Sequence, residues 1–149
     1  MEEIIRASIF RRSVREVGYY ERCGNWSEKD IVNPEQAKVL AELEKLVGKS
    51  IPSITKIGWN TVGVQFEGDT IIGLGLYGCG LTTLPESFGN LKSLKELYLA
   101  SNQLTTLPES FTQLSNLQWL DIYENPLDAK GKKILDQLKK NAKGVKIWD

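Results

Sequence analysis

The sequence predicts a mixed α/β fold in which repeated coils stack and their strands lie side by side in a parallel sheet. The stretch LTTLPESF occurs at residues 81–88 and again at 104–111, which is 23 residues later. Apolar residues alternate with other residues just before each copy, as in strands with one buried face. Helical patterns flank the repeats on both sides. Because a single coil cannot bury its own apolar face, neighbouring coils must share one core.

A shift of 23 residues aligns two consecutive copies at nine positions and a third copy in part. The third copy departs from the pattern after Pro126. The aligned residues of the first two copies are Ile71, Leu74, Leu76, Cys79, Leu81, Leu84, Pro85, Phe88 and Leu91 with Leu94, Leu97, Leu99, Asn102, Leu104, Leu107, Pro108, Phe111 and Leu114, and the third copy contributes Leu117, Leu120, Ile122, Asn125 and Leu127.

This pattern resembles the leucine-rich-repeat (LRR) family in its 23-residue LPxxF variety over roughly residues 71–127. The resemblance implies a short solenoid with a concave parallel sheet. A helix and hairpin before the repeats look like the N-terminal cap of microbial members. It also implies non-catalytic protein recognition by an intracellular scaffold, with a Ras-like GTPase as one possible partner.

The ninth position of each repeat is Cys79, Asn102 or Asn125. It falls where the chain turns away from the strand. A side-chain amide there satisfies backbone groups that would otherwise be buried without partners. We therefore expect both asparagines to be buried and bonded to the backbone.

Residues 33–149 form the predicted repeat domain, with an N-terminal helix and hairpin over 33–69, repeats over 70–127 and a C-terminal helical cap over 128–149. Asn33 and Pro34 predict a helix start, and Gly48 predicts its end. The alternation in 62–66 predicts a strand, with a turn at 67–69 and the first repeat strand after it. Asp128 is the expected N-cap of a last helix that carries Ile134, Leu135 and Leu138, and VKIW predicts a final short strand.

Residues 1–32 form a predicted arm of different composition, with a helix expected over 3–16. All five arginines of the chain lie within residues 1–22. The arm carries the alternative hypothesis for function, in which it is the active element and the repeats only support it.

Composition excludes several classes of protein. Nineteen basic and nineteen acidic residues give no net charge, so nothing indicates nucleic-acid binding. The longest apolar run is too short for a membrane span, and the first residues lack a signal-peptide pattern, which favours the cytoplasm. There is no histidine, and two cysteines make neither a disulfide framework nor a metal site.

Two motifs suggest chemistry but fit it poorly. Residues 73–78 spell G-x-G-x-x-G, yet a nucleotide site needs a helix directly after this motif, and LTTLP follows instead. We therefore predict no cofactor. Cys79 belongs to the repeat turn, and Cys23 beside Arg22 leaves a small enzyme or a thiol-redox protein as the remaining alternative.

The concave face is the predicted binding surface. Parallel strands in register place Gly73, Glu96 and Trp119 in one row, and Gly75, Tyr98 and Asp121 in the next. The glycines would leave a shallow notch on the first coil; alternatively, Tyr98 lies over Gly75 and only shields it. Aromatic residues are enriched at binding hot spots, and acids beside them suit a basic, apolar partner. The predicted partner-binding residues are Tyr77, Glu96, Tyr98, Trp119, Asp121 and Tyr123.

Overall fold

The computed structural model describes residues 33–149. The helix expected over 3–16, the arginine-rich arm and Cys23 lie outside the described residues.

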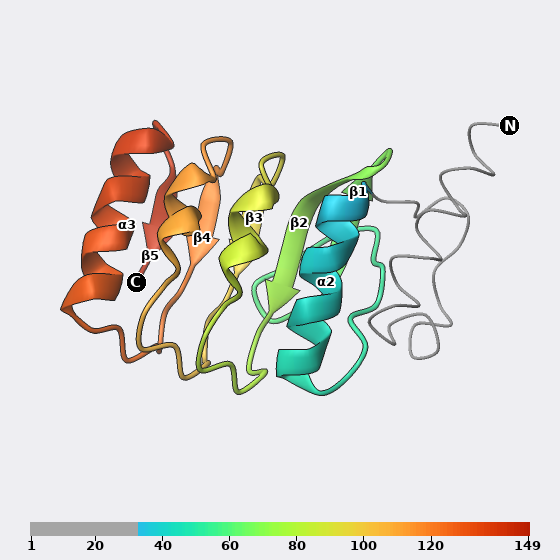
Figure 1. The fold of residues 1–149 in the computed structure, drawn as a ribbon, viewed down its shortest axis with the longest axis horizontal. Coiled ribbons are helices and arrows are strands. Elements are labelled where there is room, and N and C mark those ends of the chain that lie inside the picture. The colour runs from blue at the N-terminus through green and yellow to red at the C-terminus, as the bar shows by residue number, and fades with distance from the viewer. Residues whose placement is uncertain (1–32) are drawn as a thin grey trace, which may run out of the picture.

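Within residues 33–149, a five-stranded sheet has the strand order β1-β2-β3-β4-β5 (Figure 1). β1 and β2 form an antiparallel hairpin, and every later strand pairs in parallel with the one before it. The mixed α/β repeat fold is therefore confirmed. The strands are β1 (Val62–Glu67), β2 (Thr70–Leu76), β3 (Glu96–Tyr98), β4 (Trp119–Asp121) and β5 (Lys146–Trp148).

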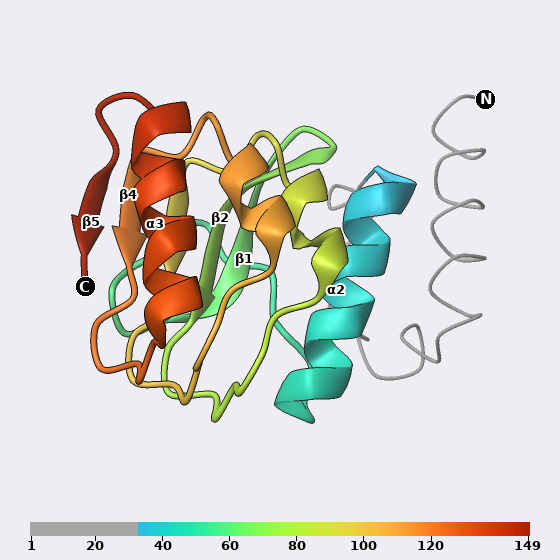
Figure 2. The same ribbon diagram turned by 60° about the vertical axis from the view of Figure 1, so that its left-hand side comes forward.

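The helical segments of residues 33–149 lie in a row against one face of this sheet (Figures 1 and 2). The core lies between the two layers, and no helix of residues 33–149 lies on the other face of the sheet. We call that other side the open face. The helical segments are α2 (Pro34–Val47), the 3-10 helices η2 (Glu86–Asn90) and η3 (Glu109–Gln113), and α3 (Ala129–Asn141).

The repeat register predicted from the sequence is confirmed. Leu74, Leu97 and Leu120 form one buried row across the sheet because each residue is the direct neighbour of the next. The phenylalanines of the LPxxF segments belong to the 3-10 helices, and their side chains are buried. The rings of Phe88 and Phe111 stack with centroids 5.7 Å apart. Each coil thus fills the core of its neighbour, as stacked repeats require.

Asn102 joins consecutive coils through its side-chain amide. Its Oδ1 accepts hydrogen bonds from the backbone N–H groups of Cys79 and Leu81 in the coil before it, at 2.9 and 3.1 Å. Its Nδ2 donates to the carbonyls of Leu76, Leu99 and Ala100. Asn102 is 6% exposed, so the prediction for this residue is confirmed.

Asn125 repeats this arrangement one coil later, but it is only half-buried. Its Oδ1 accepts from the Leu104 N–H, and its Nδ2 donates to three carbonyls, those of Leu99, Ile122 and Tyr123. The predicted backbone bonds are confirmed, whereas the predicted full burial is wrong. Asn125 is less buried because its neighbours Glu124 and Pro126 are both exposed, at the point where the repeat pattern ends.

The residue before each ninth position adopts a left-handed backbone conformation. Gly78, Ser101 and Glu124 have φ values of 60°, 58° and 58°. Such values disfavour side chains with a Cβ by about 1–2 kcal/mol, so only the first coil uses the preferred residue. The other two are held by a contact between their own side chains, in which Ser101 Oγ donates to Glu124 Oε2 at 2.6 Å.

Helix α2 begins and ends where the sequence predicts. The Asn33 side chain accepts from the Glu35 N–H at 2.9 Å, and the chain leaves the helix at Gly48 in a left-handed conformation. Leu40 and Leu43 are fully buried, as expected. Gln36 connects the helix to the sheet, because its Oε1 accepts from the Ile71 N–H of β2 at 2.9 Å.

The C-terminal elements also match the prediction. Asp128 accepts from the Gly131 N–H at 2.8 Å and so begins α3, whose Ile134, Leu135 and Leu138 are buried. The VKIW segment forms β5 next to β4.

The segment 48–61 connects α2 to the sheet and folds over its first edge. Ser53 pairs with Val64 along the outer side of β1. The chain then crosses to the open face, where the Ile57 N–H donates to Gln65 Oε1 at 3.2 Å. A covered edge leaves fewer free backbone groups for another strand to pair with.

Candidate functional site on the open face

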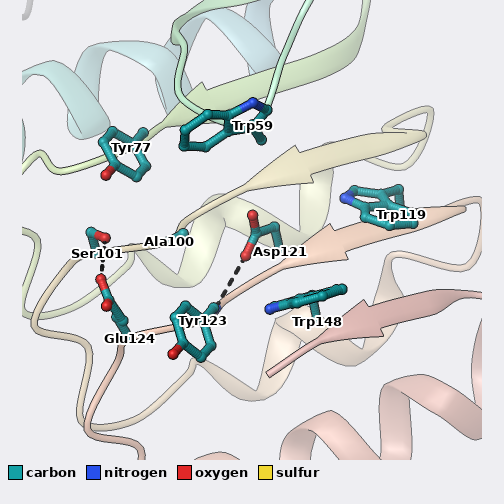
Figure 3. Close-up of a pocket in the computed structure, with 9 residues that line it drawn as sticks. All are labelled: Trp59, Tyr77, Ala100, Ser101, Trp119, Asp121, Tyr123, Glu124 and Trp148. Carbon is teal, nitrogen blue, oxygen red and sulfur yellow. Dashed lines mark hydrogen bonds between the residues drawn. The ribbon is translucent and has the colours of Figure 1, made fainter.

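The open face contains a hollow of about 480 Å³ at the end of the sheet where β2 to β5 finish. Five aromatic side chains and two carboxylates contribute to its wall (Figure 3). We call it the aromatic hollow. The residues that line it are Trp59, Tyr77, Ala100, Ser101, Trp119, Asp121, Tyr123, Glu124 and Trp148.

Strand alternation places the central residues of the hollow. In β4, Leu120 points into the core, so Trp119 and Asp121 must point to the open face. Trp148 is the direct neighbour of Asp121 in β5 and therefore points the same way. Tyr123 follows β4 at the turn, and Figure 3 shows its ring beside that of Trp148.

The opposite wall comes from the segment 48–61. Trp59 packs edge-on against Tyr77, with ring centroids 5.9 Å apart and an interplanar angle of 85°. In Figure 3, Asp121 lies between Trp59 on one side and Tyr123 and Trp148 on the other. These three rings remain 63%, 49% and 59% exposed, so their faces are available to a ligand.

The charge of the lining residues is entirely negative. Asp121 Oδ1 accepts from the Tyr123 N–H at 3.2 Å, and Glu124 is bonded to Ser101. Burial raises the pKa of Asp121 above its ordinary value of 3.8, although the Tyr123 bond opposes this shift. Within residues 33–149, no lysine forms an ion pair with Asp121 or Glu124.

Four of the six predicted site residues line the hollow, namely Tyr77, Trp119, Asp121 and Tyr123. Glu96 and Tyr98 do not, although they occupy the predicted rows. They bond to each other instead, with Tyr98 Oη donating to Glu96 Oε2 at 3.0 Å. Burial, followed by this bond and the nearby charges of Glu96 and Asp121, raises the pKa of Tyr98 to about 12.

The predicted glycine notch on the first coil is wrong. A Cβ on Gly75 would collide with the carbonyl oxygen of Thr61 and lie 3.0 Å from Ile57 Cδ1. One on Gly73 would lie 3.3 Å from Gln65 Cβ and from Ile57 Cγ2. The chain's own segment 48–61 therefore occupies this space, and it covers Gly75 more closely than Tyr98 does.

Sequence reasoning missed Trp59 and Trp148. The sequence contained enough information to find Trp148. Extending the row of Gly75, Tyr98 and Asp121 to the expected last strand leads to this residue. Trp59 had no such signal, since it lies in an irregular segment outside the repeats. Only its large aromatic side chain in a polar, turn-rich stretch was unusual.

The described part of the chain gives no support to a metal site, a reactive thiol or a membrane-spanning helix. Residues 33–149 contain no group of three or more potential metal ligands among histidine, cysteine and the acids. Burial raises the pKa of the Cys79 thiol, although Lys49 opposes the shift, so the reactive thiolate is disfavoured. Neither α2 nor α3 has the length and apolar character that a membrane crossing needs.

A family model covers the repeats of this chain. A family model described as "Leucine rich repeat" matches residues 74–127. Among solved structures, an LRR protein of Leptospira interrogans is similar, with 24% identity and a TM-score of 0.40; the alignment covers 90% of this chain and 38% of that one. A search of curated proteins gives no match.

The fold and the matched repeats thus define the class, a repeat protein with a mixed α/β sheet. The family-model match supports a leucine-rich-repeat family for this chain. Domains of this family are generally protein-interaction modules.

Proposed function

We propose that residues 33–149 act as a non-catalytic module that binds a partner protein or peptide through the aromatic hollow. In this proposal the coils form a short solenoid, the open face is its concave face, and the elements before and after the repeats close its two ends. The observation that carries the proposal is the group of exposed rings around Asp121.

Exposed aromatic rings that are grouped around one space are typical of a recognition surface. Trp59, Tyr123 and Trp148 each expose about half or more of their surface, and they face one common space. Tryptophan and tyrosine dominate binding hot spots because they bury a large area and lose little conformational freedom. A hollow of about 480 Å³ lies within the usual range for ligand pockets, so it fits one or two side chains of a partner.

The partner's size is limited by the dimensions of the sheet. Strands about 4.8 Å apart give the parallel part of the open face a width of only ~15–20 Å. This area suits a peptide or the edge of a protein and is small for an obligate interface. A Ras-like GTPase is the partner class that the family resemblance implies, and the arginine-rich arm over 1–22 is the competing functional element.

Affinity capture from the source cell's lysate tests this proposal. The full-length chain serves as bait, and the captured protein is then purified and titrated against variants. We expect Tyr123→Ala and Trp148→Ala each to weaken binding by ~2 kcal/mol or more. Tyr98→Ala should have a smaller effect because Tyr98 does not line the hollow.

The control is Leu46→Ala, which removes an exposed apolar side chain from α2 on the other side of the sheet. It should leave binding unchanged. A partner that binds the hollow variants as tightly as the parent, but is lost when the five arginines of the arm are changed to glutamine, would replace this proposal with the arm hypothesis.

A further inference from the structure

Resting on the proposed function, we infer that the aromatic hollow binds an arginine side chain of the partner. The guanidinium lies among the rings of Trp59, Tyr123 and Trp148 and pairs with Asp121. The inference names the chemistry of the bound group, which the proposal of a protein-binding face leaves open.

The charges around the hollow favour a cation. Asp121 is half-buried among aromatic rings, and within residues 33–149 its side chain accepts a hydrogen bond from the Tyr123 N–H but forms no ion pair. Burial disfavours a carboxylate that has no counter-charge. Glu124 adds a second carboxylate to the same wall, while no lysine of residues 33–149 lines the hollow.

Lys146 is the basic residue closest to the site in strand register. It is the β5 neighbour of Trp119, one row away from Asp121 and Trp148. Its side chain is exposed and does not contribute to the lining. Residues 33–149 therefore supply no counter-charge to Asp121 within the hollow.

The rings select the same kind of group. The faces of tryptophan and tyrosine carry negative electrostatic potential, which attracts cations placed within about 6 Å. Figure 3 shows rings on both sides of Asp121, so a cation bound to the carboxylate also meets aromatic faces. An uncharged apolar side chain would fit the rings but leave Asp121 unpaired and more deeply buried.

Arginine fits this arrangement better than lysine does. Its planar guanidinium stacks on aromatic faces and donates hydrogen bonds from its edge, so one group satisfies both the rings and the carboxylate. Because it is less strongly hydrated than an ammonium group, it also loses less on entering a partly closed site. A protein segment with an exposed arginine between apolar residues is the expected occupant.

Two peptides that differ only in charge test the inference on the full-length chain. The probe is the blocked pentapeptide acetyl-GLRLG-amide, and its control replaces arginine with citrulline, which has nearly the same shape and no charge. Binding is followed by the NMR cross-peaks of the tryptophan indole N–H groups. We expect the arginine peptide to shift the cross-peaks of Trp59 and Trp148 and to bind roughly tenfold more tightly than the citrulline peptide.

Three variants separate charge, aromatic character and fold. Asp121→Asn should remove most of the preference for arginine without lowering the melting temperature, because burial already disfavours the charged carboxyl. Trp148→Leu keeps an apolar side chain but loses the ring face, so it should weaken the arginine peptide more than the citrulline peptide. Glu86→Gln, an exposed acid of η2 on the other side of the sheet, should change neither affinity.

Several results would overturn the inference. Equal binding of the two peptides, weakened alike by Trp148→Leu, would contradict the cation while leaving the proposed protein-binding face intact. Absence of binding by the arginine peptide would reject arginine as the occupant, and the capture experiment would still decide the proposed function. Indole shifts in the peptide-free chain after all five arginines of residues 1–22 are changed to glutamine would assign the hollow to this chain's own arm.

Discussion

A single asparagine side chain carries much of the connection between neighbouring coils. Asn102 satisfies two N–H groups and three carbonyls, most of them at the turn where the strand ends. No other side chain type of similar size has two donors and an acceptor in this geometry. The repeat therefore depends on this residue for hydrogen bonding rather than for shape.

Changing Asn102 to alanine should lower the free energy of unfolding by ~1–3 kcal/mol, because the backbone groups that it satisfies remain buried without partners. The same change at Asn125 should cost less, since that turn is half-exposed and water replaces part of the lost bonding.

Cys79→Asn should be tolerated, because the carbonyls of Leu76 and Tyr77 stand at the positions where the carbonyls of Leu99 and Ala100 accept from Asn102. Chemical denaturation of the three variants measures these differences. Equal stability of Asn102→Ala and the parent would contradict the repeat register.

Sequence reasoning identified these asparagines because the 23-residue period isolates one polar position among apolar ones. It did not identify the left-handed residues beside them. Gly78 takes this place in the first coil, while Ser101 and Glu124 occupy it with ordinary side chains in the next two. Their conformation follows from the turn that the asparagines hold, which is a tertiary effect.

At the scale of elements, α2 covers the core of the first coil. Its buried residues face η2 and the first strands, whereas its outer side is polar. Because Leu40 and Leu43 are fully buried, we expect the helix to be part of one cooperative fold with the repeats.

Leu43→Ala should therefore destabilise the chain by ~2–5 kcal/mol through the lost contacts and the cavity that remains. Leu46→Ala is the matched control, since Leu46 lies on the same helix and is 43% exposed. Thermal unfolding followed by circular dichroism should show one transition for both variants, shifted strongly only in Leu43→Ala. A separate early transition, with the main one unmoved, would show that α2 is an independent appendage.

The irregular segment 48–61 was the element that sequence reasoning could not place. Its path depends on contacts distant in sequence, such as the bond from Ile57 to Gln65 and the closeness of Thr61 to Gly75. The glycines at 73 and 75 predicted a notch open to a ligand's backbone, but Ile57 and Thr61 of this chain fill that space. Composition alone did not reveal that the segment 48–61 lies there.

At the scale of the whole molecule, the period of the sequence predicted more of the fold than of the site. Strand order and register follow from the repeats, because each coil dictates the position of the next. The hollow combines residues from the segment 48–61, the repeat turns, β4 and β5. Trp148 follows from extending the strand row to the last strand, whereas Trp59 emerged only from the assembled structure.

The most direct test of the binding face is hydrogen–deuterium exchange of the full-length chain with and without its captured partner. The account predicts slower exchange at residues 57–61, 119–124 and 146–148, which surround the hollow, and unchanged exchange in α2 and α3. Protection confined to residues 1–32, or to the helical side of the sheet, would contradict the claim that the open face is the recognition surface.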